Sequence, residues 1–453
     1  MKLDEVVASR VAVWGLGVEG AALVRLLQAR GCTPVLVDDR PVEARLRLAE
    51  AGRSEMFGGG GEVHDPDSIV WGDLDVVVRS PGVSRYRREF EVAGDAGVVV
   101  TTAMAIWLED MAGENVLAVT GSKGKSTTAT MTAALLREEG FAVELVGNIG
   151  TPVTDTYDRP PAGFHVVEVS SYQAADVTHS PRAVVLTGLG ADHLDWHGGV
   201  ENYYRDKLRL VSAGPEPMLA VSAASPEALA RTSHVHDRIL FGPDGRVVLR
   251  EDGMIAVDSE VVIDSDRLRV PGRHNVWNLC GAISGFLLAV GRAPGRGSLE
   301  AMVANFSGLP SRCAVVGEFA GRTFVDDALA SNPLATVTSL EAFAGRPVAV
   351  IVGGADRGVD LFPLVEALAA RDEPTSVVVL PPEPHRWTAA LGTALAPDSL
   401  VVADDLDGAV GNAFSLAGEG GVVLFSPAAP TPEGGGGYQA RSARFIAAAK
   451  GVG

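Results

Sequence analysis

The chain has 453 residues, of which 47% are hydrophobic and 21% charged, so it is too long for one ordinary core and typical of a globular protein. Its net charge of −19 argues against nucleic acid as the main partner, and an anionic ligand would need local devices such as helix N-termini. No run of about 18 uncharged apolar residues is present, so we expect no membrane insertion. The N-terminus does not resemble a signal peptide, and Cys32, Cys280 and Cys313 lack metal-ligand spacing, which predicts free thiols in the cytoplasm.

The first of three α/β segments is expected over residues 1–102. Its strand runs are VAVWGLG (11–17), PVLVDD (34–39) and LDVVVRSPGV (74–83), and a helix ended by Gly31 lies between the first two. Strands that alternate with helices predict a parallel sheet wound in the right-handed sense.

The second segment is expected over residues 103–308 and the third over 309–453. Strand runs of the second are VLAVTG, AVELVGN, HVVEVSS and AVVLTGL, followed by short runs with glycine and aspartate turns over 215–270. Glycine and proline interrupt the pattern in FSGLPSR (306–312), which marks the boundary. The runs TFVDDA, VAVIVGG, SVVVLPP and VVLFSP then alternate with helical stretches. We therefore predict an α/β protein of three domains.

A phosphate-binding loop is indicated by VLAVTGSKGKSTT (116–128), which reads as a strand, a glycine turn and a helix start. It matches the short form TGxxGK[ST], whose residues here are Thr120, Gly121, Ser122, Lys123, Gly124, Lys125, Ser126 and Thr127. Backbone amides around Gly121 can face a β-phosphate, Lys125 can reach the β- and γ-phosphates, and Ser126 can bind Mg²⁺. The loop predicts ATP but does not distinguish an ATPase, a kinase and a ligase.

Three residues downstream are candidates for the chemistry. Glu168 ends a hydrophobic strand, where a carboxylate of a parallel sheet points to the ligand crevice and can bind Mg²⁺, although an exposed loop acid is the alternative. His193 can ligate a second Mg²⁺ or bond a phosphate, but a single histidine is more often structural. Lys207 lies among aromatic and apolar residues in ENYYRDKLRL (201–210), and taken alone it is more often a surface lysine.

Two further motifs suggest nucleotide binding. Asn275 and Asn278 lie three residues apart on one face of a helix start, where they can hold an adenine edge or cap the helix; capping is the more usual role for Asn275 alone. GLGVEG (15–20) is a GxGxxG sequence, and Asp38 lies where a dinucleotide fold holds a ribose. Alone, this second motif suggests NAD(P), but it is weak evidence.

Taken in order, the motifs resemble the Mur ligase family over nearly the whole chain. The matching elements are TGSKGKSTT (120–128), GNIG (147–150), EVSSYQ (168–173), DHLD (192–195), Lys207, HNVWN (274–278), Arg312 and DDALASNP (326–333). The length, together with GNIG, SSYQ and SNP, is most similar to family members that add glutamate to UDP-N-acetylmuramoyl-L-alanine in peptidoglycan precursor synthesis. The resemblance implies a Rossmann-like UDP-binding domain, a central ATPase domain and a Rossmann-like C-terminal domain that closes over the substrates.

The resemblance also implies residue roles. Catalytic roles fall to Lys125, Asn148, His193 and Lys207, and the Mg²⁺ ligands would be Ser126, Glu168, His193 and Lys207 in carbamylated form. Besides the loop, ATP would be contacted by Asn275 and Asn278 at the adenine, Arg312 at the phosphates and Asp327 at the ribose. The substrate carboxylate would attack the γ-phosphate, and an amine would then attack the resulting acyl phosphate.

Substrate contacts are implied in the two outer domains. For the UDP end they are Gly17, Asp38, Asp39, Arg40, Ser80, Pro81 and Gly82. For the amino acid they are Ser331, Asn332, Arg357, Ser426, Thr431 and Tyr438.

The chain departs from the family pattern at several positions. Lys123 stands where asparagine is usual, and Glu19 where a small hydroxyl residue is usual. Ala328 and Leu329 replace a serine and a lysine, and SPAAPTPE (426–433) replaces SPACASFD. The last two changes lie where the family binds D-glutamate, so we favour the branch that adds L-glutamate, with a separate epimerase acting on the product.

Other interpretations remain open at this point. The same reaction with D-glutamate is the nearest alternative, and a folylpolyglutamate-type ligase or a catalytically inactive relative is more distant. An NAD(P)-dependent oxidoreductase using the N-terminal GxGxxG sequence is the alternative from another class. We expect a monomer.

Overall fold

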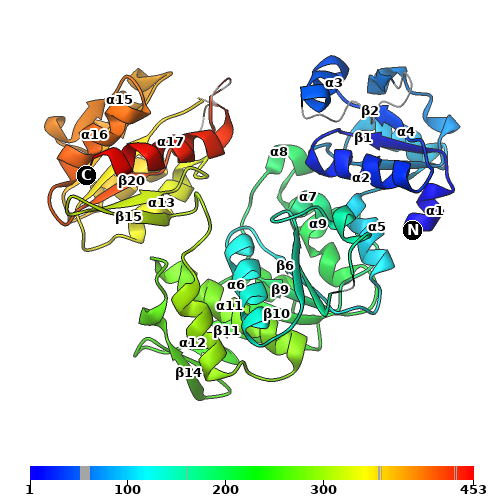
Figure 1. The fold of residues 1–453 in the computed structure, drawn as a ribbon, viewed down its shortest axis with the longest axis horizontal. Coiled ribbons are helices and arrows are strands. Elements are labelled where there is room, and N and C mark those ends of the chain that lie inside the picture. Colours follow the sequence, from blue (N-terminus) through cyan, green and yellow to red (C-terminus); the bar gives the residue numbers. More distant parts are fainter. Residues whose placement is uncertain are drawn as a thin grey trace. The chain divides into compact units, whose positions relative to one another are not determined.

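The computed structural model describes residues 1–50, 62–160, 162–355, 358, 360–432, 434 and 436–452. Within these residues the strands form three sheets, which the chain enters one after another (Figure 1). The predicted α/β class, with three successive sheet-forming segments, is confirmed.

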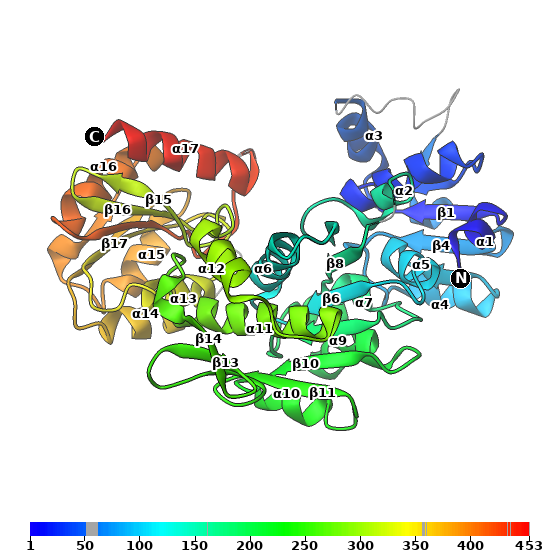
Figure 2. The ribbon, with the colours of Figure 1, turned by 60° about the horizontal axis from the view of Figure 1, so that its bottom comes forward.

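The first sheet has five parallel strands in the order β3-β2-β1-β4-β5. Its elements are α1 (Leu3–Val7), β1 (Val11–Trp14), α2 (Val18–Ala29), β2 (Val35–Val37), α3 (Pro41–Glu50), β3 (Val63–His64), β4 (Val76–Arg79), α4 (Arg88–Asp95) and β5 (Val99–Thr101). Alternate residues of β1 pack on opposite faces, Val13 in a cluster with α2 and Trp14 in a cluster with α4. Helices α2 and α4 lie on opposite sides of this sheet (Figure 2). The strand order reverses between β1 and β4, which favours a ligand crevice beyond their carboxyl ends.

The second sheet has the order β14-β13-β12-β11-β10-β9-β6-β8-β7. After α5 (Ala103–Asp110) come β6 (Val116–Thr120), α6 (Lys125–Glu138), β7 (Val143–Gly147), β8 (Phe164–Glu168), α7 (Ser171–Ala174), β9 (Ala183–Leu186), α8 (Leu194–His197), α9 (Val200–Ser212), β10 (Met218–Ser222), α10 (Pro226–Arg231), β11 (Arg238–Gly242), β12 (Val247–Leu249), β13 (Met254–Val257), β14 (Glu260–Asp264), α11 (Arg273–Val290) and α12 (Arg296–Asn305). The region with short runs, 215–270, contributes β10 to β14, and β12 to β14 are antiparallel. The parallel pairings run in the order β7, β8, β6, β9, β10, β11 and β12, and the phosphate-binding loop follows the carboxyl end of β6, in the middle of this part.

The third sheet has the order β15-β16-β20-β17-β18-β19. Its elements are β15 (Ala314–Phe319), β16 (Arg322–Asp326), α13 (Pro333–Glu341), β17 (Val348–Val352), α14 (Phe362–Ala369), β18 (Thr375–Val379), α15 (Pro384–Leu391), β19 (Leu400–Val402), α16 (Leu406–Ala417), β20 (Val422–Phe425) and α17 (Gly437–Gly451). Val350 of β17 packs in a cluster with α13, α14 and α15, and Ile351 in a cluster with α16 and α17. Both faces are covered, which explains the continuous hydrophobic strand runs.

The chain divides into two compact units, Met1–Ser265 with Trp277–Met302, and Asp266–Val276 with Val303–Gly453. Each range of the predicted three-domain division contains one sheet, but the first two sheets share a unit, so the boundaries at 102 and 308 stay predictions.

Across the described residues, no helix has the length and apolar character needed to cross a bilayer. Cys32, Cys280 and Cys313 are free, buried thiols, one within the range of each sheet.

Candidate functional site

The phosphate-binding loop connects β6 to α6 through two glycines in the left-handed region. Gly121 has φ 147° and Gly124, the N-cap of α6, has φ 82°. A Cβ at Gly121 would collide with the Thr187 hydroxyl, and one at Gly124 with the amide oxygen of Asn278. Only glycine therefore fits the loop at these two positions.

Several polar side chains of the loop are used inside the protein. Thr120 is fully buried and donates to the Val169 carbonyl at 2.8 Å. The Ser122 hydroxyl donates to the Gly190 carbonyl at 2.6 Å, and its amide donates to the Gly188 carbonyl at 2.9 Å. These contacts fix the loop and leave phosphate binding to the later amides and to Lys125.

The side chains at the start of α6 differ in exposure. Ser126 is buried and Thr127 half-buried. Lys125 Nζ donates to the Ser122 carbonyl at 3.1 Å, so the ammonium group lies over the loop. Lys123 is exposed and pairs with Asp192 at 3.5 Å. The loop thus carries two lysines, one on the α6 helix and one tied to the segment that precedes His193.

Glu168 and Asn148 form the clearest candidate for a metal site. Glu168 ends β8 and is buried, so it is not the exposed loop acid of the alternative interpretation. Asn148 Nδ2 donates to Glu168 Oε1 at 3.0 Å, whereas Glu168 Oε2 is buried and has no hydrogen-bond partner among the described residues. A buried carboxylate oxygen without a partner is costly, and a bound cation would satisfy it.

His193 lies at the N-cap of α8 in a left-handed conformation, with φ 52°. Its side chain is half-exposed, and its ring centroid lies 5.0 Å from that of Tyr172. Burial lowers the His193 pKa, nearby Asp192 opposes that effect, and the surrounding lysines add to it. A neutral imidazole is the form that ligates metals. Within the described part of the chain no group of three His, Cys, Asp or Glu side chains could hold a metal alone, so a bound cation would also need other oxygen ligands.

Lys207 is not at the surface, although that is the more usual place for a lysine considered by itself. It lies on α9 and is only 2% exposed. Its Nζ donates to the Gly121 carbonyl at 2.9 Å and lies 5.1 Å from the centroid of the Tyr203 ring. Burial holds the Lys207 pKa well below its usual value, and the Lys125 charge lowers it further. The buried amine therefore lies directly beneath the phosphate-binding loop.

A buried polar chain next to Lys207 was not predicted from the sequence. His197 Nδ1 lies 2.8 Å from Asp206 Oδ2, and its Nε2 lies 3.0 Å from Ser171 Oγ. All three residues are almost completely buried. These hydrogen bonds connect α7, which follows Glu168, to Asp206, the residue before Lys207.

The predicted adenine contacts lie at the start of α11. Asn275 Nδ2 donates to the Pro271 carbonyl at 2.7 Å, which agrees with the capping alternative for that residue. Asn278 is buried, and its amide oxygen lies 3.4 Å from the Thr128 hydroxyl and close to Gly124. Within its unit, Asn278 thus contacts the loop itself.

The remaining predicted nucleotide contacts lie near the third sheet. Arg312 is exposed. Asp327 is buried, and its carboxylate accepts hydrogen bonds from Ser339 at 2.6 Å, Ser426 at 2.7 Å and the Cys313 amide at 3.0 Å. Burial raises the Asp327 pKa to about 6 against the pull of these bonds. Asp327 is already well bonded inside its own unit.

All seven residues predicted to bind the UDP end line one cavity of about 500 Å³ beyond the carboxyl ends of β1, β2 and β4. They are Gly17, Asp38, Asp39, Arg40, Ser80, Pro81 and Gly82, and Glu19, Glu43 and Arg47 also line it. Asp38 accepts from the Leu16 amide at 2.9 Å and the Arg40 amide at 3.1 Å, so it shapes the glycine turn. Asp39 pairs with Arg87 at 2.7 Å.

The predicted amino-acid contacts are spread over the third sheet. Ser331 is exposed, and Asn332 caps α13 by accepting from the Ala335 amide at 3.0 Å. Ser426 is fully buried and bonds to Asp327, whereas Thr431 and Tyr438 are half-buried. Arg357 lies outside the described residues.

Arg441, on α17, is a candidate that the sequence analysis missed. Its Nη2 donates to the Gly353 carbonyl at 2.8 Å, and its guanidinium lies 5.1 Å from the centroid of the Phe425 ring. Its Nη1 is buried and has no hydrogen-bond partner among the described residues. Burial lowers the Arg441 pKa to about 10. The sequence feature that could have identified Arg441 is its position three residues after the predicted contact Tyr438, on the same face of the helix.

Family models, curated relatives and a solved structure are similar to this chain. Residues 119–285 match the Mur ligase middle domain, and residues 311–429 match the Mur ligase, glutamate ligase domain. A UDP-N-acetylmuramoyl-L-alanine–L-glutamate ligase of a Micromonospora species is 38% identical and covers 95% of this chain and 94% of its own length. A ligase of the same name from Salinispora tropica is 37% identical, with 95% of each chain covered. The crystal structure of the UDP-N-acetylmuramate–alanine ligase of Thermotoga maritima shares the fold, with a TM-score of 0.61, 18% identity and coverage of 98% of this chain and 100% of that one.

The fold and the site together define an ATP-dependent ligase that forms amide bonds and releases ADP. The chain belongs to the Mur ligase family. The resemblance inferred from the sequence motifs is confirmed, and the oxidoreductase interpretation of GLGVEG is wrong.

Proposed function

We propose that this chain joins L-glutamate to UDP-N-acetylmuramoyl-L-alanine and converts ATP to ADP and phosphate. The observation that carries the proposal is the identity of 38% and 37%, over nearly the whole chain, to two ligases named for that reaction. The departures at 328–329 and 426–433 favoured L-glutamate over D-glutamate, and they agree with those names.

The first half-reaction activates the alanyl carboxylate of the substrate. A carboxylate oxygen attacks the γ-phosphorus, the bond to ADP breaks, and an acyl phosphate forms. Lys125 lies over the loop and balances the negative charge that gathers on the transferred phosphoryl group. The Ser122 amide already donates to Gly188, so phosphate oxygens are left to the amides that follow it.

Mg²⁺ fits the residues at the end of β8. Glu168 Oε2 is the buried acceptor that a cation would satisfy, and Ser126, His193 and carbamylated Lys207 are the further candidate ligands. Bound Mg²⁺ would supply positive charge to the phosphate oxygens. Asn148 fixes the orientation of the Glu168 carboxylate through its 3.0 Å hydrogen bond.

Carbamylation of Lys207 is supported by its surroundings. A lysine must be neutral to react with CO₂, and burial favours the neutral amine. The product is an anion, which the nearby charge of Lys125 would stabilise and which would add a negatively charged ligand for Mg²⁺.

Nucleotide contacts beyond the loop have uneven support. Asn278 contacts Gly124 and is the best supported of them. Asn275, Arg312 and Asp327 remain proposed contacts, and Asp327 could bind a ribose only by exchanging one of its three internal hydrogen bonds.

The second half-reaction joins the amino acid. The glutamate nitrogen attacks the acyl carbon, phosphate leaves, and the nitrogen loses a proton to give the amide. Arg441, with one buried nitrogen free to donate, is the described cation best suited to a glutamate carboxylate. Ser331, Thr431 and Tyr438 complete the proposed pocket.

Phosphate release from the purified chain tests the proposal. Release should require ATP, Mg²⁺, UDP-N-acetylmuramoyl-L-alanine and glutamate together, and should be faster with L-glutamate than with D-glutamate. Lys125→Ala, which removes the loop ammonium, should be inactive in the same assay. A clear preference for D-glutamate would contradict the choice of enantiomer, and release without the UDP substrate would contradict the reaction.

Three properties around this reaction also remain proposals. The product would be the substrate of a separate epimerase, the chain would act in the cytoplasm, and it would be a monomer.

A further inference from the structure

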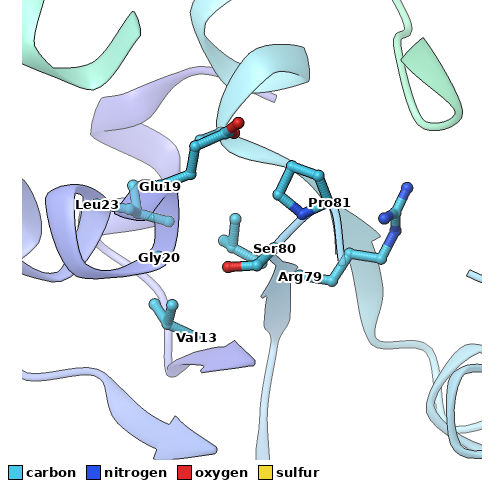
Figure 3. A pocket seen from close by; sticks show the side chains of 9 residues that line it. Val13, Glu19, Gly20, Leu23, Arg79, Ser80 and Pro81 are labelled. Atoms are coloured by element: carbon cyan, nitrogen blue, oxygen red, sulfur yellow. The ribbon is translucent and has the colours of Figure 1, made fainter. Parts of the chain in front are cut away.

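Glu19 lies on the first turn of α2, at the edge of the N-terminal cavity. It lines both the large cavity and a small adjoining pocket, where its carboxyl group lies across from Ser80 and Pro81 (Figure 3). The helix N-terminus attracts anions to this place, and the proposed UDP substrate carries a diphosphate. A carboxylate there is unexpected, because it would repel the diphosphate.

One oxygen of Glu19 is held by a residue from the second sheet. Gln173 Nε2 donates to Glu19 Oε1 at 2.6 Å. The orientation of this amide is fixed, because its oxygen accepts from the Ser170 amide at 2.9 Å. Gln173 is the one donor to the Glu19 carboxyl group among the described residues. The second oxygen, Oε2, is therefore left for a ligand.

Among the described residues, no basic side chain forms an ion pair with Glu19. The charge of Arg79 acts on Glu19, but its guanidinium donates to Asp176 at 2.7 Å and to two backbone carbonyls, and it points away from the pocket (Figure 3). Burial raises the Glu19 pKa to about 7, with the Gln173 hydrogen bond and the Arg79 charge opposing it. The other charged groups around the cavity are Asp38 and Asp39 after β2, and Arg40, Glu43 and Arg47 at and on α3.

The geometry points to Glu19 as a specificity-determining residue that binds the diphosphate-linked substrate as a neutral carboxylic acid, accepting from Gln173 on Oε1 and donating to the substrate from Oε2. This inference rests on the proposed function. The resembled family has a small hydroxyl residue at this position, which is also a donor. Glu19 keeps that donor only while protonated, so substrate binding takes up a proton when the free carboxyl group is ionised.

Calorimetric titration of the full chain with UDP-N-acetylmuramoyl-L-alanine tests this coupling. At one pH, buffers of different ionisation enthalpy report the protons taken up per substrate bound. We expect an uptake of about half a proton at pH 7, rising towards one at pH 8, and a Kd that increases up to about tenfold per pH unit above 7. Each phosphate of this probe carries one ester and one anhydride linkage and keeps no weakly acidic hydroxyl, so neither titrates in that range.

Two variants identify the group that takes up the proton. Glu19→Gln keeps a donor in place of the acid, so it should bind with no proton uptake and with a nearly constant Kd from pH 6 to 8. Glu43→Gln removes an exposed carboxyl group from the same cavity and should keep the wild-type pH dependence. The inference is overturned if wild type binds without proton uptake, or if Glu19→Gln keeps the wild-type pH dependence. Absence of binding by wild type at every pH would instead contradict the proposed function.

Discussion

Asn148 donates to one oxygen of Glu168 over 3.0 Å, while the other oxygen of that carboxylate is buried beside the loop without a partner among the described residues. One side chain thus orients the carboxylate, and the other oxygen is the atom that we propose as a ligand of Mg²⁺. The pair comes from GNIG and EVSSYQ, two motifs about twenty residues apart on neighbouring strands β7 and β8.

Replacing Asn148 by alanine should weaken Mg²⁺ binding by about 10- to 100-fold, because the Glu168 carboxylate would lose its orientation. The Mg²⁺ dependence of phosphate release measures this change. Asn115→Ala, at an asparagine that bonds to the Gly163 carbonyl at the opposite end of the sheet, is the matched control and should leave that dependence unchanged. A lower kcat with an unchanged Mg²⁺ dependence would show that Asn148 acts on the substrate instead.

Lys207 should carry a carbamate in the active enzyme, because its buried amine is held neutral. Incubation with ¹³C-labelled bicarbonate should give a carbamate carbon signal by NMR in wild type and none in Lys207→Arg. Lys450→Arg, at an exposed lysine of α17, should keep the signal. A signal that survives in Lys207→Arg would place the modification elsewhere.

His197→Gln should destabilise the chain by about 2 kcal/mol, because the buried Asp206 carboxylate would lose its 2.8 Å hydrogen bond to the imidazole and keep those from the Tyr86 hydroxyl. The urea midpoint of unfolding reports the loss. His236→Gln is the control, since that side chain is 92% exposed and also contacts a glutamate, and its effect should stay within about 0.5 kcal/mol. Equal midpoints for the two variants would contradict a structural role for the buried hydrogen bonds of His197.

Arg441→Lys should raise the KM for glutamate about tenfold and leave the KM for ATP unchanged, because lysine cannot reproduce the planar donor set. Arg444→Lys, on the same helix but paired with Asp405 and Asp407 at the surface, should not change either value. Equal changes in both KM values for Arg441→Lys would indicate a general structural role.

Asp327 should make stability depend on pH. Its folded pKa of about 6 lies above the unfolded value of about 3.9, so the folded chain binds an extra proton between these values, and stability falls as pH rises from about 4 to about 6. The loss at neutral pH is about 3 kcal/mol. Asp327→Asn should flatten this part of the curve of unfolding free energy against pH, whereas Asp372→Asn, at an exposed position, should retain it. If the difference between the wild-type and Asp327→Asn curves shows no fall in stability from about pH 4 to about pH 6, the assignment is refuted.

The N-terminal cavity was predictable because its residues follow strands whose order is fixed by topology. Gly17, Asp38 and Ser80 come directly after β1, β2 and β4, and parallel strands bring their carboxyl ends together. What could not be predicted was how side chains there are already used. Asp39 is bonded to Arg87, which comes from a loop nearly fifty residues away, and no spacing in the sequence indicates that pairing.

The same limit applies to the catalytic region. Glu168 was predictable because it ends a strand, and Lys207 because of its place among the family motifs. The structure has Glu168 at the end of β8 and Lys207 on α9, as expected. The role of His197 depends on how α7, α8 and α9 pack, which burial decides and local sequence does not. A second histidine in DHLDWHG was the only available signal.

The three thiols offer an internal reporter of local opening. Burial raises the thiol pKa of Cys32, and raises that of Cys280 and Cys313 to about 12, so burial and the raised pKa both slow the reaction of these thiols in the native fold. Because one lies within the range of each sheet, alkylation followed by peptide mass analysis would time the unfolding of the three regions separately in a single unlabelled protein.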